Sequence, residues 1–121
     1  MRYLMIIAAV LYAAGTPVYA QQLTARDVLA IKERTASGGF SARSEWTALG
    51  YYLQGVIEGA AGYQQALTAA GKPALFCPPK GKNYSVDEIF RFLDRASDED
   101  KSRPASAVII EAYAGAFPCR E

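Results

Sequence analysis

The sequence predicts an all-α protein: a small, bundle-like domain of four or more helices with one long-range disulfide, preceded by a cleaved signal peptide. Three observations lead to this prediction. The chain of 121 residues opens with an apolar stretch behind one positive charge. Apolar residues then recur at helical spacing in several segments. Each of the two cysteines lies beside a proline, where helix growth stops.

The first twenty residues are typical of a secretory signal peptide. Arg2 precedes the apolar stretch, and Val18 and Ala20 provide the small or slim side chains that a signal peptidase accepts. The stretch is shorter than the roughly 20 residues that a membrane-spanning helix needs. We therefore expect cleavage after Ala20, export to the periplasm and a single mature domain over residues 21–121.

The first two helices are predicted over residues 25–35 and 45–70. Thr24 and Asp27 have the spacing of a capping box, in which both side chains accept backbone N–H groups at a helix start. The second helix is expected to end at Gly71, because glycine commonly caps a helix C-terminus. Its apolar positions recur mostly at helical spacing: Trp46, Leu49, Leu53, Ile57, Ala60 and Leu67.

The second helix is rich in glycine, and each glycine costs about 1 kcal/mol relative to alanine in a helix. Gly55 and Gly59 are four residues apart and share one face. We expect this face to pack closely against another backbone inside the domain, and the alternative is a seam between two copies. The full set is Gly50, Gly55, Gly59 and Gly62.

Two further helices follow. Ser85 and Glu88 have the spacing of a full capping box for the third helix. Residues 97–103 are expected to form a charged connection. The fourth helix is expected to begin at Pro104 and to end before Pro118. Its apolar positions form one unbroken face: Ala105, Val108, Ile109, Ala112, Tyr113, Ala116 and Phe117.

Cys77 and Cys119 are expected to form the disulfide. Thiols pair in an oxidising compartment, and two cysteines allow a single intramolecular bridge. The alternative is a reactive thiol, but the chain has no Cys-x-x-Cys motif and no histidine. We therefore expect the bridge to join the loop after the second helix to the end of the fourth.

The composition favours binding over catalysis. Removal of the signal peptide leaves twelve basic and twelve acidic residues, so the net charge is near zero. Nothing in this balance suggests binding to nucleic acid, which normally needs a basic stripe. The chain lacks histidine, the commonest general base and metal ligand. We expect no enzyme activity, no cofactor, no metal site and no membrane association of the mature form.

Four segments follow the pattern of a known family. They are a Tyr-x-x-Gly helix, a Cys-Pro loop, an amphipathic helix and a last helix ending in Pro-Cys. In this chain they read YYLQGVIEGAAGY, FCPPKG, SVDEIFRFLDR and RPASAVIIEAYAGAFPC. From Trp46 to Cys119 the chain resembles the Rap/Tai family of type VI secretion immunity proteins. The resemblance implies a periplasmic, all-helical, often dimeric protein that blocks the active site of a peptidoglycan amidase effector from a sister cell, without catalysis of its own.

Two loops are candidates for contact with such a partner, because an inhibitor must project a fixed feature into a cleft. The alternative is that both are plain solvated connections. The candidate residues are Lys80, Lys82, Tyr84, Asp98, Glu99, Asp100, Lys101 and Arg103.

Two other functions fit a small, exported helical protein. A periplasmic acid-stress chaperone also combines a signal peptide, helices and a long-range disulfide. Charged residues make up 21% of this chain, however, below the typical value of about 25%. The remaining alternative is an accessory protein of a secretion or conjugation apparatus.

Overall fold

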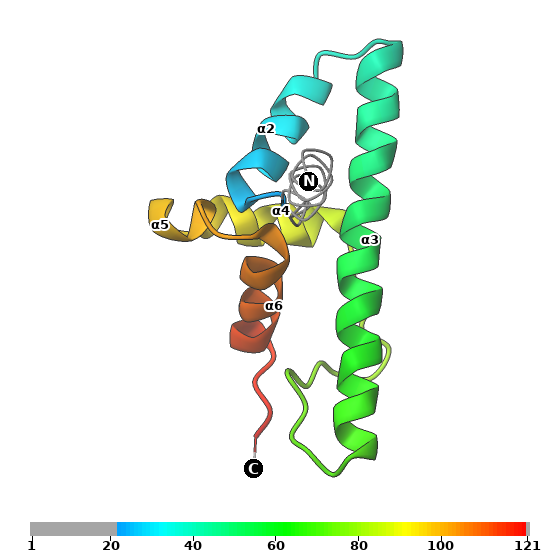
Figure 1. Ribbon diagram of the computed structural model, residues 1–121, viewed down its shortest axis with the longest axis vertical. Coiled ribbons are helices and arrows are strands. Elements are labelled where there is room, and N and C mark those ends of the chain that lie inside the picture. Colours follow the sequence, from blue (N-terminus) through cyan, green and yellow to red (C-terminus); the bar gives the residue numbers. More distant parts are fainter. Residues whose placement is uncertain (1–21, 121) are drawn as a thin grey trace, which may run out of the picture.

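The computed structural model describes residues 22–120, and their fold is all-α, as predicted (Figure 1). α3 runs along one side of the molecule, and α2 packs against α3, α4 and α6. The predicted signal peptide and the cleavage site after Ala20 lie outside the described residues. The helices, in chain order, are α2 (Ala25–Thr35), α3 (Phe40–Ala69), α4 (Val86–Arg95), α5 (Asp98–Lys101) and α6 (Ala105–Ala116).

The hydrophobic core lies where α2, α4 and α6 meet the first two thirds of α3. The last buried residue of α3 is Ala60, and the rest of the helix runs beside the loop that leads to α4 (Figure 1). Burial of apolar surface contributes about 25 cal/mol per Å², so these side chains hold the four longer helices together. The largest fully buried side chains are Tyr113, Leu53, Ile89, Leu93, Ile109 and Val28.

α2 begins at the predicted capping box. The N–H of Asp27 donates to Thr24 Oγ1 at 3.1 Å, and the N–H of Thr24 donates to Asp27 Oδ2 at 2.9 Å. This end of the helix is also tied to the start of α6, since the N–H of Ala105 donates to the carbonyl of Leu23 at 2.8 Å. The cap and the tie place the first described residues against the last helix.

α3 begins five residues earlier than the sequence predicted, at Phe40. The break between α2 and α3 is confined to the residues around Gly38 and Gly39, which have φ values of 81° and 101°. Glycine adopts this left-handed region at no steric cost, so the chain turns there and enters the next helix at once. α3 ends as predicted, because Gly71 has φ 70° and Lys72 N–H donates back to a carbonyl in the last turn.

The expected close packing of the glycine face inside the domain is wrong. Nothing beyond the immediate helix lies within 4 Å of the position that a Cβ would take at any of the four helical glycines. α3 instead turns Leu49, Leu53 and Ala60 toward the core, and these lie on the opposite side from Gly55. The glycine face of α3 is therefore open.

Only one of the two hydrogen bonds of the capping box predicted for α4 is present. Glu88 N–H donates to Ser85 Oγ at 3.2 Å, as expected. The Glu88 carboxylate does not return to the Ser85 N–H, because it is bound by Lys82 and Tyr113 instead. The Glu88 side chain thus makes contacts with the loop and with α6 in place of the local capping contact.

The segment predicted as a plain charged connection contains a helical turn, α5. Ser97 caps this turn by accepting the N–H of Asp100 at 3.1 Å, and acidic residues fill the first turn, where they favour the helix dipole. α6 follows with Pro104 as its N-cap, one residue before the first helical position. Buried residues of α6 confirm most of its predicted apolar face: Ala105, Val108, Ile109 and Tyr113.

Candidate partner-binding site

The loop between α3 and α4 is fastened to the domain near its start. The side-chain carbonyl of Gln64 on α3 accepts the backbone N–H groups of Leu75 and Phe76, both at 3.1 Å. Phe76 is buried, and its ring stacks on Tyr113 of α6. This arrangement carries the chain from the end of α3 across to α6.

The predicted disulfide between Cys77 and Cys119 is confirmed. It joins residues 42 apart in the sequence, with the Cα atoms 4.9 Å apart. The backbone N–H of Cys77 also donates to the carbonyl of Phe117 at 2.7 Å. The bond and the hydrogen bond together fasten the loop to the chain segment just after α6.

The three candidate contact residues of this loop differ in their surroundings. Lys80 is exposed, and it forms no ion pair with the described residues. Lys82 is half-buried and pairs with Glu88, with 2.7 Å between Nζ and Oε2. Tyr84 lies edge-on to the Tyr113 ring, with 5.2 Å between the ring centroids. Of the two candidate lysines of this loop, Lys80 is thus the one exposed to solvent.

Electrostatics reinforce the anchor of Lys82. Burial raises the pKa of Glu88, but hydrogen bonds from Lys82 and Tyr113 outweigh it, and the pKa lies below its ordinary value. Burial and the bond to this carboxylate raise the pKa of Tyr113, whose hydroxyl lies 3.0 Å from Glu88 Oε1. Glu88 is therefore held as a carboxylate, and Tyr113 as a phenol that donates to it.

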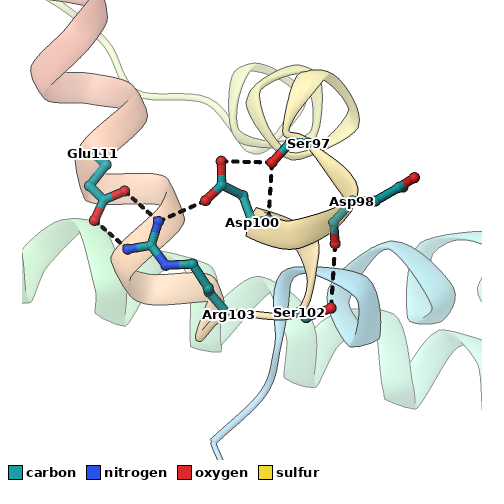
Figure 2. A network of polar contacts seen from close by, with 6 residues as sticks. All are labelled: Ser97, Asp98, Asp100, Ser102, Arg103 and Glu111. Carbon is teal, nitrogen blue, oxygen red and sulfur yellow. Dashed lines mark hydrogen bonds and ion pairs between the residues drawn. The ribbon is translucent and has the colours of Figure 1, made fainter.

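The second candidate surface is a chain of polar contacts around α5 (Figure 2). Asp100 receives a hydrogen bond from Ser97 Oγ at 3.0 Å and one from Arg103 at 2.8 Å. The other side of the Arg103 guanidinium faces Glu111 of α6, with 2.8 Å from Nη1 to Oε2. Figure 2 shows Arg103 between the two carboxylates, so one cation joins α5 to α6.

These contacts hold the charges of the network in place. The hydrogen bonds with Glu111 and Asp100 raise the pKa of Arg103, and the same guanidinium lowers the pKa of both carboxyls. Among the other candidate residues, Asp98 and Glu99 are exposed, whereas Lys101 is half-buried. The surface presents mixed charge, most of it already paired within the chain.

The structure does not bring the two candidate surfaces together. The loop enters α4 at its first residue and α5 follows its last, so they lie at opposite ends of a helix of ten residues (Figure 1). At 1.5 Å per residue this helix is about 15 Å long. A small cleft in a partner could receive one of the two surfaces, and only a larger interface could cover both.

The structure also reveals exposed aromatic residues along α3. Phe40, Tyr51 and Tyr63 were not singled out from the sequence, and Trp46, expected on the apolar face of the helix, is exposed as well. One sequence signal could have found them, since Glu58 is the only charged residue between Trp46 and Ala70. A helix without a charged face is normally covered on most sides.

Two shallow grooves follow this helix, of about 530 Å³ and about 500 Å³. They share Ile57 and Tyr84, and no charged residue lines either of them. The grooves therefore offer apolar, hydroxyl and amide groups to a partner. Among residues 22–120, no group of three or more His, Cys, Asp or Glu side chains could hold a metal ion.

These features define an all-helical, disulfide-bonded domain with surfaces suited to binding another protein. The family model of Rap1a immunity proteins matches residues 20–119, and the chain belongs to this family. The partner of an immunity protein is a secreted effector. No curated protein and no solved structure gives a significant match. Within the described part of the chain, no helix has the length and apolar character needed to cross a membrane.

Proposed function

We propose that this chain is a periplasmic immunity protein that binds and inhibits a peptidoglycan amidase effector of a type VI secretion system. It would protect the cell that makes it from its own effector and from that of sister cells. The observation that carries the proposal is the family match over residues 20–119, nearly the whole of the expected mature domain. The predicted signal peptide supports it, since export would place the protein where peptidoglycan is exposed to attack.

The proposed mechanism is obstruction rather than catalysis. The loop with Lys80, Lys82 and Tyr84 is the stronger candidate for entering the effector's active-site cleft. It is fastened by a disulfide, a half-buried ion pair and an aromatic contact. A loop held in one conformation loses little conformational entropy on binding, which favours affinity.

The α5 surface is proposed to contact the rim of the same partner. Its candidate residues carry both signs of charge, which suits the polar rim of an interface better than its centre. Charges at a rim mainly steer association and set its salt dependence. The proposed contacts are Asp98, Glu99, Asp100, Lys101 and Arg103.

We also propose that two copies associate through the open face of α3. A two-fold interface places the same residues of both copies against each other, so a face with few charges avoids repulsion. The face around Gly55 and Tyr51 is exposed and carries Glu58 as its one charge. Analytical ultracentrifugation should give a dimer for the native chain and a monomer for Gly55→Glu, and a native monomer would contradict self-association.

The test of function is capture from a periplasmic extract with the mature protein, bridge intact, repeated with Cys77→Ser. We expect one cell-wall amidase in a stoichiometric complex, inactive while bound, and weaker capture by the variant because the loop loses its anchor. Many unfolded clients would instead favour the chaperone function. A secretion or conjugation scaffold would favour the accessory function, and either result would overturn the proposal.

A further inference from the structure

Three side chains from three parts of the chain meet in one half-buried polar cluster. Lys82 comes from the loop, Glu88 from α4 and Tyr113 from α6. The Lys82 ammonium and the Glu88 carboxylate are 2.7 Å apart, with side-chain exposures of 20% and 15%. Tyr113 is 1% exposed, and its hydroxyl lies 3.0 Å from the second carboxylate oxygen. Both oxygens of one carboxylate are thus used to join a loop to two helices.

Aromatic rings enclose this cluster. The Lys82 ammonium lies 5.3 Å from the centre of the Phe117 ring and 6.0 Å from that of Tyr84. Phe92 packs edge-on against Tyr113 on another side. Rings lower the local dielectric and attract a cation over their faces, so the ion pair is stronger here than at an open surface. Removing either charge would leave the other half-buried without its partner.

The ion pair acts on a tight turn. Lys82 N–H donates to the carbonyl of Pro79 at 3.2 Å, and Gly81 between them has φ 77°. One end of the turn follows Cys77, which the disulfide fixes. The other end of the turn is Lys82, which has no disulfide nearby. Its side chain is held by the ion pair with Glu88.

We infer that Lys82, Glu88 and Tyr113 form a charge-dependent latch that holds the turn of residues 79–82 in one orientation. Lys82 and Glu88 are positioning residues, and Tyr113 orients the carboxylate. The latch belongs to the isolated protein, so the inference stands whether or not the loop meets an effector. When the latch is closed, the backbone that carries Lys80 is rigid. When the latch is open, this backbone is flexible.

The latch opens when Glu88 takes up a proton. The ionisable groups that act on Glu88 are Lys82 of the loop, Tyr113 of α6 and Arg91 of α4 itself. Arg91 and Lys82 both favour the charged carboxylate. Protonation therefore requires a pH below the ordinary carboxyl value of 4.5, and the turn is held at neutral pH.

Hydrogen exchange of the Lys82 amide, followed by NMR and expressed as a protection factor, tests this inference. We expect Glu88→Gln and Lys82→Met to lower the protection about tenfold, since a hydrogen bond to a charged group is worth about that factor. Lys82→Arg keeps the charge and should restore it. Lys80→Met is the matched control and should leave the protection factor of the Lys82 amide unchanged. The Leu53 amide in α3 reports whether each variant is folded.

A purely structural role for these side chains would not produce the expected pH profile. In the native chain the protection of the Lys82 amide should fall as the pH drops through the pKa of Glu88, while Leu53 stays protected. In Glu88→Gln this dependence should be absent. Equal protection in the native chain and folded Glu88→Gln would overturn the latch, as would an equal loss in Lys80→Met. If Glu88→Gln does not fold, a flat native profile overturns it.

Discussion

The loop before α4 and the turn after it both contain charged candidate residues, but the two segments are held in different ways. Lys82 of the loop pairs with Glu88 in a half-buried site, and a disulfide fixes the same loop at Cys77. Arg103 of the α5 turn pairs with Asp100 and Glu111, all of them 39% to 60% exposed. Water and salt weaken exposed pairs, and their median contribution is about 0–1 kcal/mol.

The difference shows that two ion pairs of the same chemical type can contribute differently to the stability of the fold. The loop is fixed by interactions that are costly to break, so its shape is part of the fold. The α5 turn is fixed mainly by backbone hydrogen bonds and a serine cap, and its charges are replaceable. This predicts large effects of substitutions around the loop and small effects around α5.

The largest effect is expected from loss of the disulfide. Cys77→Ser with Cys119→Ser should lower the free energy of unfolding by about 4 kcal/mol, because a bridge over so long a loop restricts the unfolded chain strongly. Chemical denaturation measures the change, and reduction of the native protein is the matched control. A loss below about 1 kcal/mol would show that the loop is held without the bridge.

The next effect is expected from Glu88→Gln, which should cost about 2 kcal/mol at neutral pH because it removes a charge-assisted contact in a half-buried site. In the native protein the pKa of Glu88 is lower in the folded state than its ordinary value. The Glu88 carboxylate therefore stabilises the fold fully at pH values above the ordinary pKa, and this stabilisation is lost as the pH falls through the folded pKa. The difference between native and variant proteins should therefore shrink in acid. A difference that is constant from neutral to acidic pH would argue against the ion pair.

A smaller effect of opposite sign is expected on the open face of α3. Gly55→Ala should stabilise the monomer by about 0.5–1 kcal/mol, because alanine favours the helix and the site has room. Gly71→Ala is the matched control, and it should destabilise since Gly71 has φ 70°. Thermal unfolding at low concentration measures both, and a loss of stability in Gly55→Ala that grows with concentration would show that a second copy packs closely there.

The smallest effect is expected at Arg103. Arg103→Met should destabilise the protein much less than Glu88→Gln does, because the guanidinium and both carboxylates are exposed. Urea denaturation at low and high salt measures it, and the cost should decrease at high salt. A loss of stability as large as that of Glu88→Gln, and independent of salt, would remove the contrast between the two surfaces.

The sequence predicted the features that depend on short stretches of chain. Thr24 and Asp27 cap α2 as expected, since both partners lie within one helical turn. Gly71 ended α3 as expected, since a glycine in the left-handed region is a local helix stop. The disulfide between Cys77 and Cys119 is an exception: it spans 42 residues, and it was predictable because two cysteines allow only one bridge.

Features that depend on distant contacts were not predictable in this way. Glu88 has the spacing of a capping residue, but Lys82 and Tyr113 draw its carboxylate away from Ser85. The glycine spacing shows that one face of α3 carries small residues. It does not show whether this face is turned toward the core. The direction of that face depends on where the other helices pack, which no local pattern determines.

The central claim is inhibition of a cell-wall amidase by direct binding, and the most direct measurement is a titration of that enzyme. The captured amidase would be assayed on purified peptidoglycan with increasing amounts of the mature chain, native or Lys80→Glu. We predict complete inhibition at one chain per enzyme for the native protein and a right-shifted curve for the folded variant. Full amidase activity in the presence of excess native protein would contradict the proposed function.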